Sequence, residues 1–182
     1  PFKFSVIQTY MLEFGDFYMR VFMDGAPVLE PAKTITGITQ AGTGVITSAA
    51  HGFSNGDTVF LAAIGGMIEL NQLTAVVATV TVNTFTLKDP VTGMDISTIG
   101  FSAYTSGGTA SRVFTLTTPY AAADLPLIKY TQSADVMTLV HTSYAPYDLT
   151  RSSHYAWTIT AITFASNISP PAGTPGTATS SA

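Results

Sequence analysis

The sequence predicts an all-β protein of antiparallel strands, and three observations support that class. Short segments rich in β-branched and aromatic residues recur along the chain, each bounded by Gly, Asn, Asp or Pro. Little room is left for helix. The pair Asn55-Gly56 precedes an alternating run, which is a strong signal for a tight turn. We expect antiparallel host strands with one propeller-blade-like unit, plus an inserted small β-barrel or sandwich domain.

Residues 1–33 are predicted to form the first part of the host, a meander of antiparallel strands. Apolar residues from Phe2 to Tyr10 predict one extended strand. Two pairs, Gly15-Asp16 and Asp24-Gly25, each suit a hairpin loop between alternating segments.

Residues 34–112 are predicted to be a domain inserted into a loop of the host. A strand should start at Asp57, after a turn in which Asn55 and Gly56 both have positive φ. Thr- and Gly-rich joints at 33–37 and 106–110 would connect the insert to the host, and such an insertion costs little when its ends lie close together. The expected strands of the insert cover residues 44–47, 58–62, 75–82, 84–87 and 100–104.

Residues 113–166 are predicted to return to the host. A strand at 113–116 and a helical turn at 121–126 precede four short strands, at 128–133, 135–141, 147–151 and 155–160. Four antiparallel strands of this combined length match one propeller blade. A single blade cannot close a propeller, so the other blades would lie in sequence outside this chain. Residues 167–182 are rich in Pro, Gly, Ser and Thr, which is typical of a linker or exposed arm.

The composition favours contact with other proteins over nucleic acid or membrane. Apolar residues make up 46% of the chain and charged residues only 10%, against about a quarter charged in an average soluble domain. The net charge is −4 and the seven basic residues are scattered, which argues against a nucleic-acid groove. No segment reads as a transmembrane helix or a signal peptide. The chain starts at Pro1 and not Met, which is compatible with a fragment of a longer polypeptide.

Histidine and cysteine usage gives no sign of a metal site. The chain has no cysteine, so thiolate ligands and cysteine nucleophiles are absent. His51, His141 and His154 show no ligand spacing such as His-x-x-x-His. We interpret His51 as a turn residue and the other two as strand-end or loop residues.

One carboxylate arrangement has two interpretations. Asp135, and Asp148 opposite Arg151, could provide a general acid with a charge partner. The favoured interpretation is structural, with these side chains tying loops to strands.

No segment provides a nucleophile or a phosphate loop. Ser54 and Ser133 lack a Gly-x-Ser-x-Gly elbow, and Gly65-Gly66 lacks the Lys-Ser/Thr of a phosphate loop. The sequence therefore predicts a protein that is not an enzyme, with no catalytic, cofactor-binding or metal residue and no cofactor.

A group of aromatic residues near the N-terminus could form a platform for stacking on carbohydrate. At alternate strand positions the same residues are more simply explained as core. They are Phe2, Phe4, Phe14, Phe17, Tyr18 and Phe22.

Phrases in the insert resemble a known family. They are His51-Gly-Phe-Ser-Asn-Gly-Asp-Thr-Val-Phe-Leu, Ile64-Gly-Gly-Met-Ile-Glu-Leu-Asn-Gln and Asn83-Thr-Phe-Thr-Leu. They look like the inserted β-domain of phage tail proteins, which is similar to the first catalytic-cysteine half-domain of ubiquitin-activating enzymes. The resemblance implies a fold and no activity, because catalysis in those enzymes needs a cysteine thiolate that this chain lacks.

Phrases in the host resemble tail proteins of short-tailed double-stranded-DNA phages. They include Leu12-Glu-Phe-Gly-Asp-Phe-Tyr-Met-Arg-Val-Phe-Met-Asp-Gly-Ala-Pro-Val, Thr118-Pro-Tyr and Gln132-Ser-Ala-Asp-Val-Met-Thr-Leu-Val-His. In such relatives the hairpin leads after a brief loop into a strand that ends in Thr-Pro-Tyr.

The resemblance implies a structural tail nozzle or tail tubular protein of the virion. Such proteins form a ring, commonly a hexamer, around the channel through which DNA leaves. Adaptor and fibre proteins would be its partners, and DNA would pass without specific binding or any membrane insertion of the protein. The alternative is an extracellular adhesin or binding module that recognises carbohydrate or a cell-surface partner.

Overall fold

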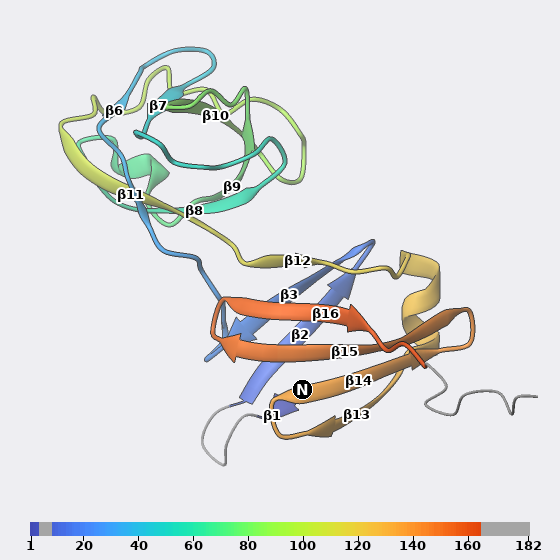
Figure 1. Ribbon diagram of the computed structural model, residues 1–182. Coiled ribbons are helices and arrows are strands. Elements are labelled where there is room, and N and C mark those ends of the chain that lie inside the picture. The colour runs from blue at the N-terminus through green and yellow to red at the C-terminus, as the bar shows by residue number, and fades with distance from the viewer. Residues whose placement is uncertain (4–8, 165–182) are drawn as a thin grey trace, which may run out of the picture.

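The strands of the chain form three antiparallel sheets in a computed structural model that describes residues 1–3 and 9–164. Two of these sheets lie together in the lower half of Figure 1, and the third lies above them. The predicted all-β class is therefore confirmed. The predictions for Phe4 and for the arm at 167–182 lie outside the described residues.

The first host sheet is built from hairpins close to the N-terminus. Its strands are β1 (Phe2–Lys3), β2 (Thr9–Gly15), β3 (Tyr18–Met23), β4 (Ala26–Pro27) and β12 (Thr115–Thr117). The Asp24-Gly25 turn has positive φ at both residues, 53° and 81°, as a tight two-residue hairpin requires. The other turn comes one residue later than predicted, with Phe17 at φ 60°.

The prediction of one strand from Phe2 to Tyr10 is wrong. β1 and β2 are separate antiparallel strands, and their register places Phe2 opposite Tyr10. Both aromatic side chains are fully buried. Phe2 and Tyr10 therefore bury their rings from two neighbouring strands and not from one.

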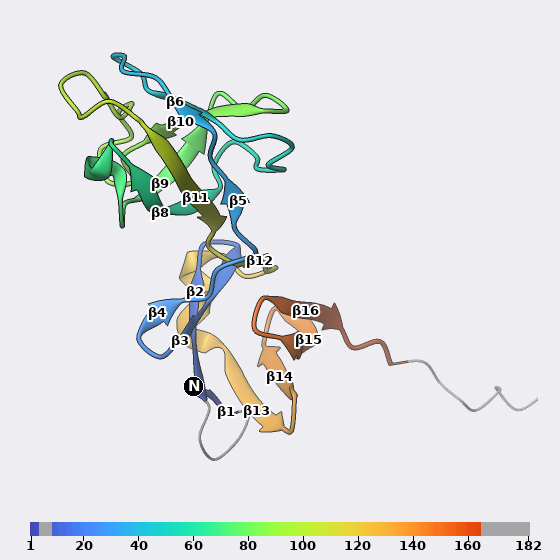
Figure 2. The same cartoon turned by 90° about the vertical axis from the view of Figure 1, so that its left-hand side faces the viewer.

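The second host sheet contains the four predicted strands in sequence order. They are β13 (Lys129–Ser133), β14 (Val136–His141), β15 (Tyr144–Ser153) and β16 (Ala156–Ala161), and they follow a 3-10 helix, η2 (Ala122–Leu127). Figure 2 shows this sheet facing the first one. The two share one core, in which the Trp157 ring lies 4.8 Å from Phe2 and 5.5 Å from Tyr10. The β13–β16 sheet, named the blade-like sheet after the sequence prediction, therefore packs face to face on the β1–β3 sheet. Its place in a propeller stays a prediction.

The third sheet lies entirely between Lys33 and Arg112. Its spatial order is β5-β11-β8-β9-β10-β7-β6. A short 3-10 helix, η1 (Ile68–Leu70), follows its longest strand. The strands are β5 (Lys33–Thr34), β6 (Gly37–Ile38), β7 (Val45–Thr47), β8 (Thr58–Gly65), β9 (Thr74–Ala78), β10 (Thr84–Lys88) and β11 (Ser106–Arg112).

This sheet curls without closing into a barrel. Its two edge strands, β5 and β6, are consecutive in the chain, with Ile35 and Thr36 between them. The Ile35 N–H donates to the Gly108 carbonyl at one edge, and the Thr36 N–H donates to the Thr47 carbonyl at the other. One segment thus holds both ends of an open sheet.

Three details of the insert differ from the sequence prediction. Only Gly56 of the Asn55-Gly56 pair has positive φ, 94°, and β8 pairs with β9 and β11 and not with the strand before the turn. Residues 100–104 form no strand. The segment 106–110, predicted as a joint, belongs to β11, a long strand paired on both sides. Its two glycines have low strand propensity, which is why this strand was not predicted from the sequence.

The insert and the host bury separate sets of apolar side chains. The insert core gathers Val59, Leu61, Met67 and Phe85 with their neighbours, all from residues 35–110. The host core gathers residues from both host sheets, including Tyr10 and Leu149. No residue belongs to both cores among the described ranges. The boundaries at 33/34 and 112/113 stay predictions.

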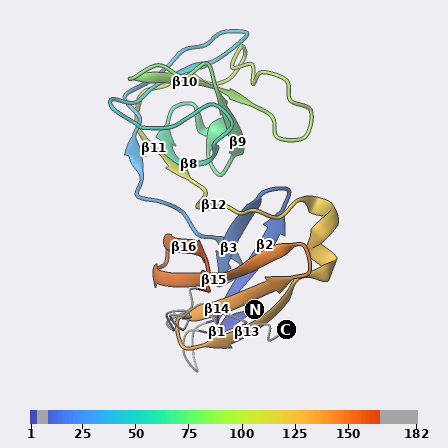
Figure 3. The same cartoon turned by 45° about the vertical axis from the view of Figure 1, so that its right-hand side comes forward.

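The chain enters and leaves the insert side by side. Glu30 N–H donates to the Arg112 carbonyl at 2.8 Å, and Leu29 bridges Val113. The Arg112 guanidinium binds Glu30 at 2.7 Å and Asp57 at 3.0 Å. Hydrogen bonding to Glu30 raises the pKa of Arg112, partly opposed by desolvation. Figure 3 shows the two crossing segments between the halves.

Deleting residues 34–111 and joining Lys33 to Arg112 through a short Gly-Ser loop should leave the host folded. The reason is that β3 still pairs with β12 and the host core loses no member. Urea unfolding followed by the fluorescence of the single tryptophan measures this result. Loss of a cooperative transition would contradict the boundaries.

Candidate functional site

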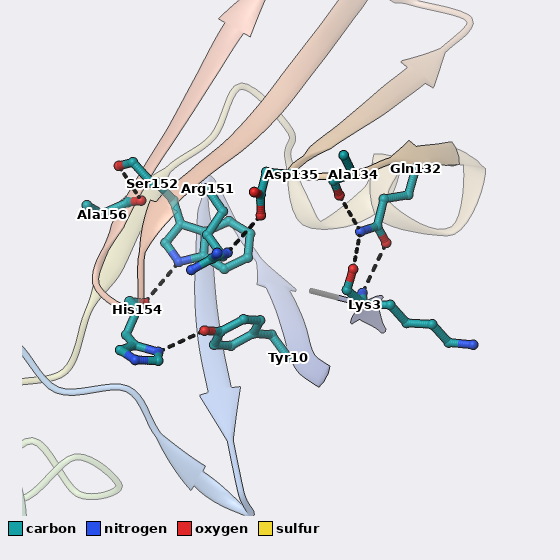
Figure 4. Close-up of polar contacts among 10 residues, drawn as sticks. Lys3, Tyr10, Gln132, Ala134, Asp135, Arg151, Ser152, His154 and Ala156 are labelled. Atoms are coloured by element: carbon teal, nitrogen blue, oxygen red, sulfur yellow. Dashed lines mark hydrogen bonds and ion pairs between the residues drawn. The ribbon is translucent and has the colours of Figure 1, made fainter. Parts of the chain in front are cut away.

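The three histidines lie in separate surroundings. His51 is buried in the insert, where its Nδ1 accepts from the Phe53 N–H at 3.0 Å. His141 Nδ1 accepts from the Ser143 N–H at 3.1 Å. His154 Nδ1 lies 2.7 Å from the Tyr10 hydroxyl, as Figure 4 shows. No group of three His, Asp or Glu side chains capable of holding a metal occurs in the described parts of the chain.

The charge partner of Arg151 is Asp135 and not Asp148. Arg151 Nε donates to Asp135 Oδ1 at 3.1 Å, and the Arg151 N–H donates to the Asp135 carbonyl (Figure 4). The guanidinium also lies over the Tyr10 ring, 5.5 Å from its centre. Asp148 instead accepts from Thr138 Oγ1 at 2.7 Å. The pairing ties the β13–β14 turn to β15, which fits the structural interpretation.

The insert carboxylates hold loops in place. Asp89 accepts from the N–H groups of Thr92 and Val91, and these bonds lower its pKa. The hydrogen bond from Lys88 lowers the pKa of Asp95 in the same way. The hydrogen bonds of both carboxylates are typical of contacts that fix loops at a surface.

The serines and glycines that lack catalytic motifs, Ser54, Ser133 and Gly65-Gly66, have ordinary structural positions. The Ser54 N–H donates to Asp57 Oδ2 at 2.8 Å, within the turn before β8. Ser133 ends β13 and pairs with Val136. Gly65 ends β8, and Gly66 has φ 81° with its backbone against that of Ala103 and Thr105.

The aromatic residues do not share one platform. Phe2 is fully buried, and Phe14 packs against the host core. Phe17 is half-exposed in a turn. Tyr18 lies on the other face of the sheet, with the Arg20 guanidinium 5.0 Å from its ring centre.

Tyr120 is a buried group with no visible role in chemistry. Its hydroxyl has no hydrogen-bond partner among the residues that the structure describes, and its ring packs on Tyr144 and Tyr147 at 5.3 and 6.0 Å. Burial, more than the neighbouring tyrosines, raises its pKa to about 12. Between the unfolded value near 10 and about 12, the unfolded chain loses this proton and the native chain keeps it, so stability falls as pH rises.

Replacing Tyr120 by Phe should therefore reduce alkaline destabilisation. At pH 7 the variant should equal or exceed the native stability, because an unpartnered buried hydroxyl is removed. Urea midpoints at pH 7, 9 and 11 measure both effects. Tyr144→Phe is the control, since it loses the bond to Asp124 Oδ2 at 2.6 Å and should be destabilised already at pH 7. An equal pH dependence in native and Tyr120→Phe chains would contradict this assignment.

The strongest candidate for a functional surface is the pair of free edges of the blade-like sheet. β13 and β16 each have a paired strand on one side only, among the described residues. Beside β13, Leu127 and Tyr130 are each 58% exposed and Val140 is 39% exposed. A hollow of about 420 Å³ is lined here by Leu127, Lys129, Val140, His141 and Thr142.

Sequence reasoning predicted these strands and missed the apolar surface beside β13. The sequence did contain a signal that β13 is an edge strand, because Lys129-Tyr-Thr-Gln-Ser is polar on both faces and carries a lysine. Such a strand is typical of a sheet edge. Gln132 is not simply solvated, because its amide bonds both the N–H and the carbonyl of Lys3 (Figure 4).

Comparison with known proteins identifies the insert alone. Residues 43–113 match the family model described as the ubiquitin-activating enzyme E1 FCCH domain, which is less than half of the chain. The match covers β7 to β11, including the His51 and Asn55-Gly56 phrases. The search of curated proteins found no match to this chain. No helix in the described ranges is long and apolar enough to span a membrane.

Proposed function

We propose that this chain is a structural component of a phage tail, a nozzle or tubular ring protein that works by assembly and not by turnover. The observation that carries the proposal is the pair of free, opposite edges of the β13–β16 sheet. In the described part of the chain each edge strand is paired on one side only, and large apolar side chains are exposed beside β13. Such edges are hazards in a monomer and are useful when another chain covers them.

Symmetry connects these edges to a ring. Because β13 and β16 lie at opposite sides of one sheet, a contact between them is head-to-tail. Head-to-tail contacts close into rings when the rotation permits. The resemblance of the host phrases to tail proteins supports a ring around a DNA channel, with six copies as the expected number and adaptor or fibre proteins as neighbours.

The insert supports a role in contact and not in catalysis. Its sequence matches an E1 FCCH domain, yet the chain has no cysteine. Several apolar side chains stand exposed on its loops, with Val82 at 75% and Val91 at 91%. We assign the insert an outward position, in which these loops meet other virion components. DNA then passes the ring without specific contact.

The size of the chain in solution tests the proposal. A ring component should form species several times larger than 19.1 kDa as concentration rises, alone or together with a longer form of itself. Mass photometry and light scattering measure this directly. If the purified chain stays monomeric, both alone and mixed with a longer form of itself, the result would favour the adhesin alternative.

A further inference from the structure

The two free edges of the blade-like sheet match each other in direction. Neighbouring strands in this sheet are antiparallel throughout, so β16 runs opposite to β13. A second copy placed beside β16 in the same orientation therefore offers its β13 as an antiparallel partner. The sheet can continue from one chain into the next without changing its pattern.

The register of the sheet fixes which residues meet. One row across the strands contains Thr131, Thr138, Asp148 and Thr160. Continuing the row into a second copy without a shift places Thr160 opposite the second copy's Thr131. In an antiparallel pair, the second residue after Thr160 faces the second residue before Thr131, so the ladder can run to Ile162 opposite the second copy's Lys129. Phe164 and Leu127, the last residue of η2, each lie two residues beyond this pair, at the same end of the sheet.

The side chains at this position are complementary. Phe164 is 83% exposed, and two residues before it the Ile162 N–H still donates to the Pro146 carbonyl of β15. Leu127 borders the hollow that also contains Val140 and Lys129. A phenyl ring seated there would contact apolar side chains, and the lysine ammonium could lie over its face.

We infer that β16 of one chain pairs with β13 of a second copy, and that Phe164 fills the hollow beside Leu127. This inference rests on the proposed function and names the contact by which the ring forms. Main-chain hydrogen bonds along the two edges would provide affinity, and the phenylalanine would fix the register.

Paired cysteines test the register, because the chain has none of its own. In the variant with Thr131→Cys and Thr160→Cys, the two positions lie on opposite edges of one sheet. About 14 Å separates these edges at the usual strand spacing, which is too far for a disulfide within one chain. Mild oxidation should give ladders of cross-linked chains on a non-reducing gel. A control with Thr160→Cys and Val91→Cys should give no ladder.

Removal of the phenylalanine tests the contact independently. Phe164→Ser should raise the concentration needed for assembly at least tenfold without changing the thermal midpoint, because the side chain is exposed in the single chain. Val91→Ser, on an insert loop, is the matched control and should assemble as the native chain does.

The outcomes separate the contact from the function. If the native chain assembles, yet the cysteine pair forms no ladder and Phe164→Ser assembles normally, the β16–β13 pairing is wrong and the copies must meet through another surface. If the native chain is monomeric in solution and in the particle, both fail.

Discussion

Replacing Gly66 by valine should unfold the insert while the host keeps its structure. Gly66 has φ 81°, which strains a β-branched residue. A Cβ there would also overlap the Ala103 carbonyl oxygen and lie 2.8 Å from the Thr105 nitrogen. Both obstacles are backbone atoms that cannot move aside cheaply. We expect a loss of at least about 3 kcal/mol from the stability of the insert.

Hydrogen exchange and tryptophan fluorescence measure the two halves separately. Exchange should accelerate across residues 43–113, while the urea midpoint from Trp157 fluorescence should stay within error, because that side chain lies in the host core. Gly56→Val is the matched control, with φ 94° and nothing within 4 Å of a Cβ, and should lose only about 1 to 3 kcal/mol. Equal effects of the two substitutions would mean that the backbone contact at Gly66 is absent.

Replacing Trp157 by alanine should have the opposite effect to Gly66→Val: it should destabilise the host and leave the insert folded. The indole is buried between the host sheets, and its Nε1 donates to the His154 carbonyl at 3.0 Å. Truncation removes the ring contacts with Phe2 and Tyr10 and leaves a cavity. We expect a loss of about 3 to 5 kcal/mol in the host, with unchanged exchange in the insert core.

Tyr155→Ala is the control for the tryptophan substitution. Tyr155 precedes the same strand and is 45% exposed, so its truncation should cost far less. Acceleration of exchange throughout residues 43–113 in Trp157→Ala would show that the two cores unfold together. It would contradict the separation of the host and insert cores.

The sequence was most informative where local chemistry decides the structure. Asp24-Gly25 predicted a hairpin because few other residue pairs accept positive φ at both positions. The four strands from Lys129 to Ala161 were found because hydrophobic alternation and short turns coincide there.

The errors arose where long-range pairing overrides local preference. β11 includes Gly107 and Gly108, which favour a linker by propensity, yet the strand is held by β5 and β8 on its two sides. The Asn55-Gly56 turn does not connect paired strands, since β8 finds its partners elsewhere. The partner of Arg151 was likewise set by the β13–β14 turn and not by spacing along the chain.

The candidate surface could not be located from the sequence alone, for a similar reason. Which strands form sheet edges, and which apolar side chains remain exposed beside them, follow from the whole sheet order. The sequence predicted the blade-like unit and its need for a partner. It could not place Phe164 and Leu127 at matching ends of opposite edges, because that match depends on the register of all four strands.

Electron cryomicroscopy of the assembled particle tests the proposed function most directly. It should show several copies in a ring, with the strands of residues 2–29 and 113–160 near the subunit contacts and the insert farther from the axis. An isolated monomer with solvated β13 and β16 edges, or an insert that lines the channel, would contradict the proposal.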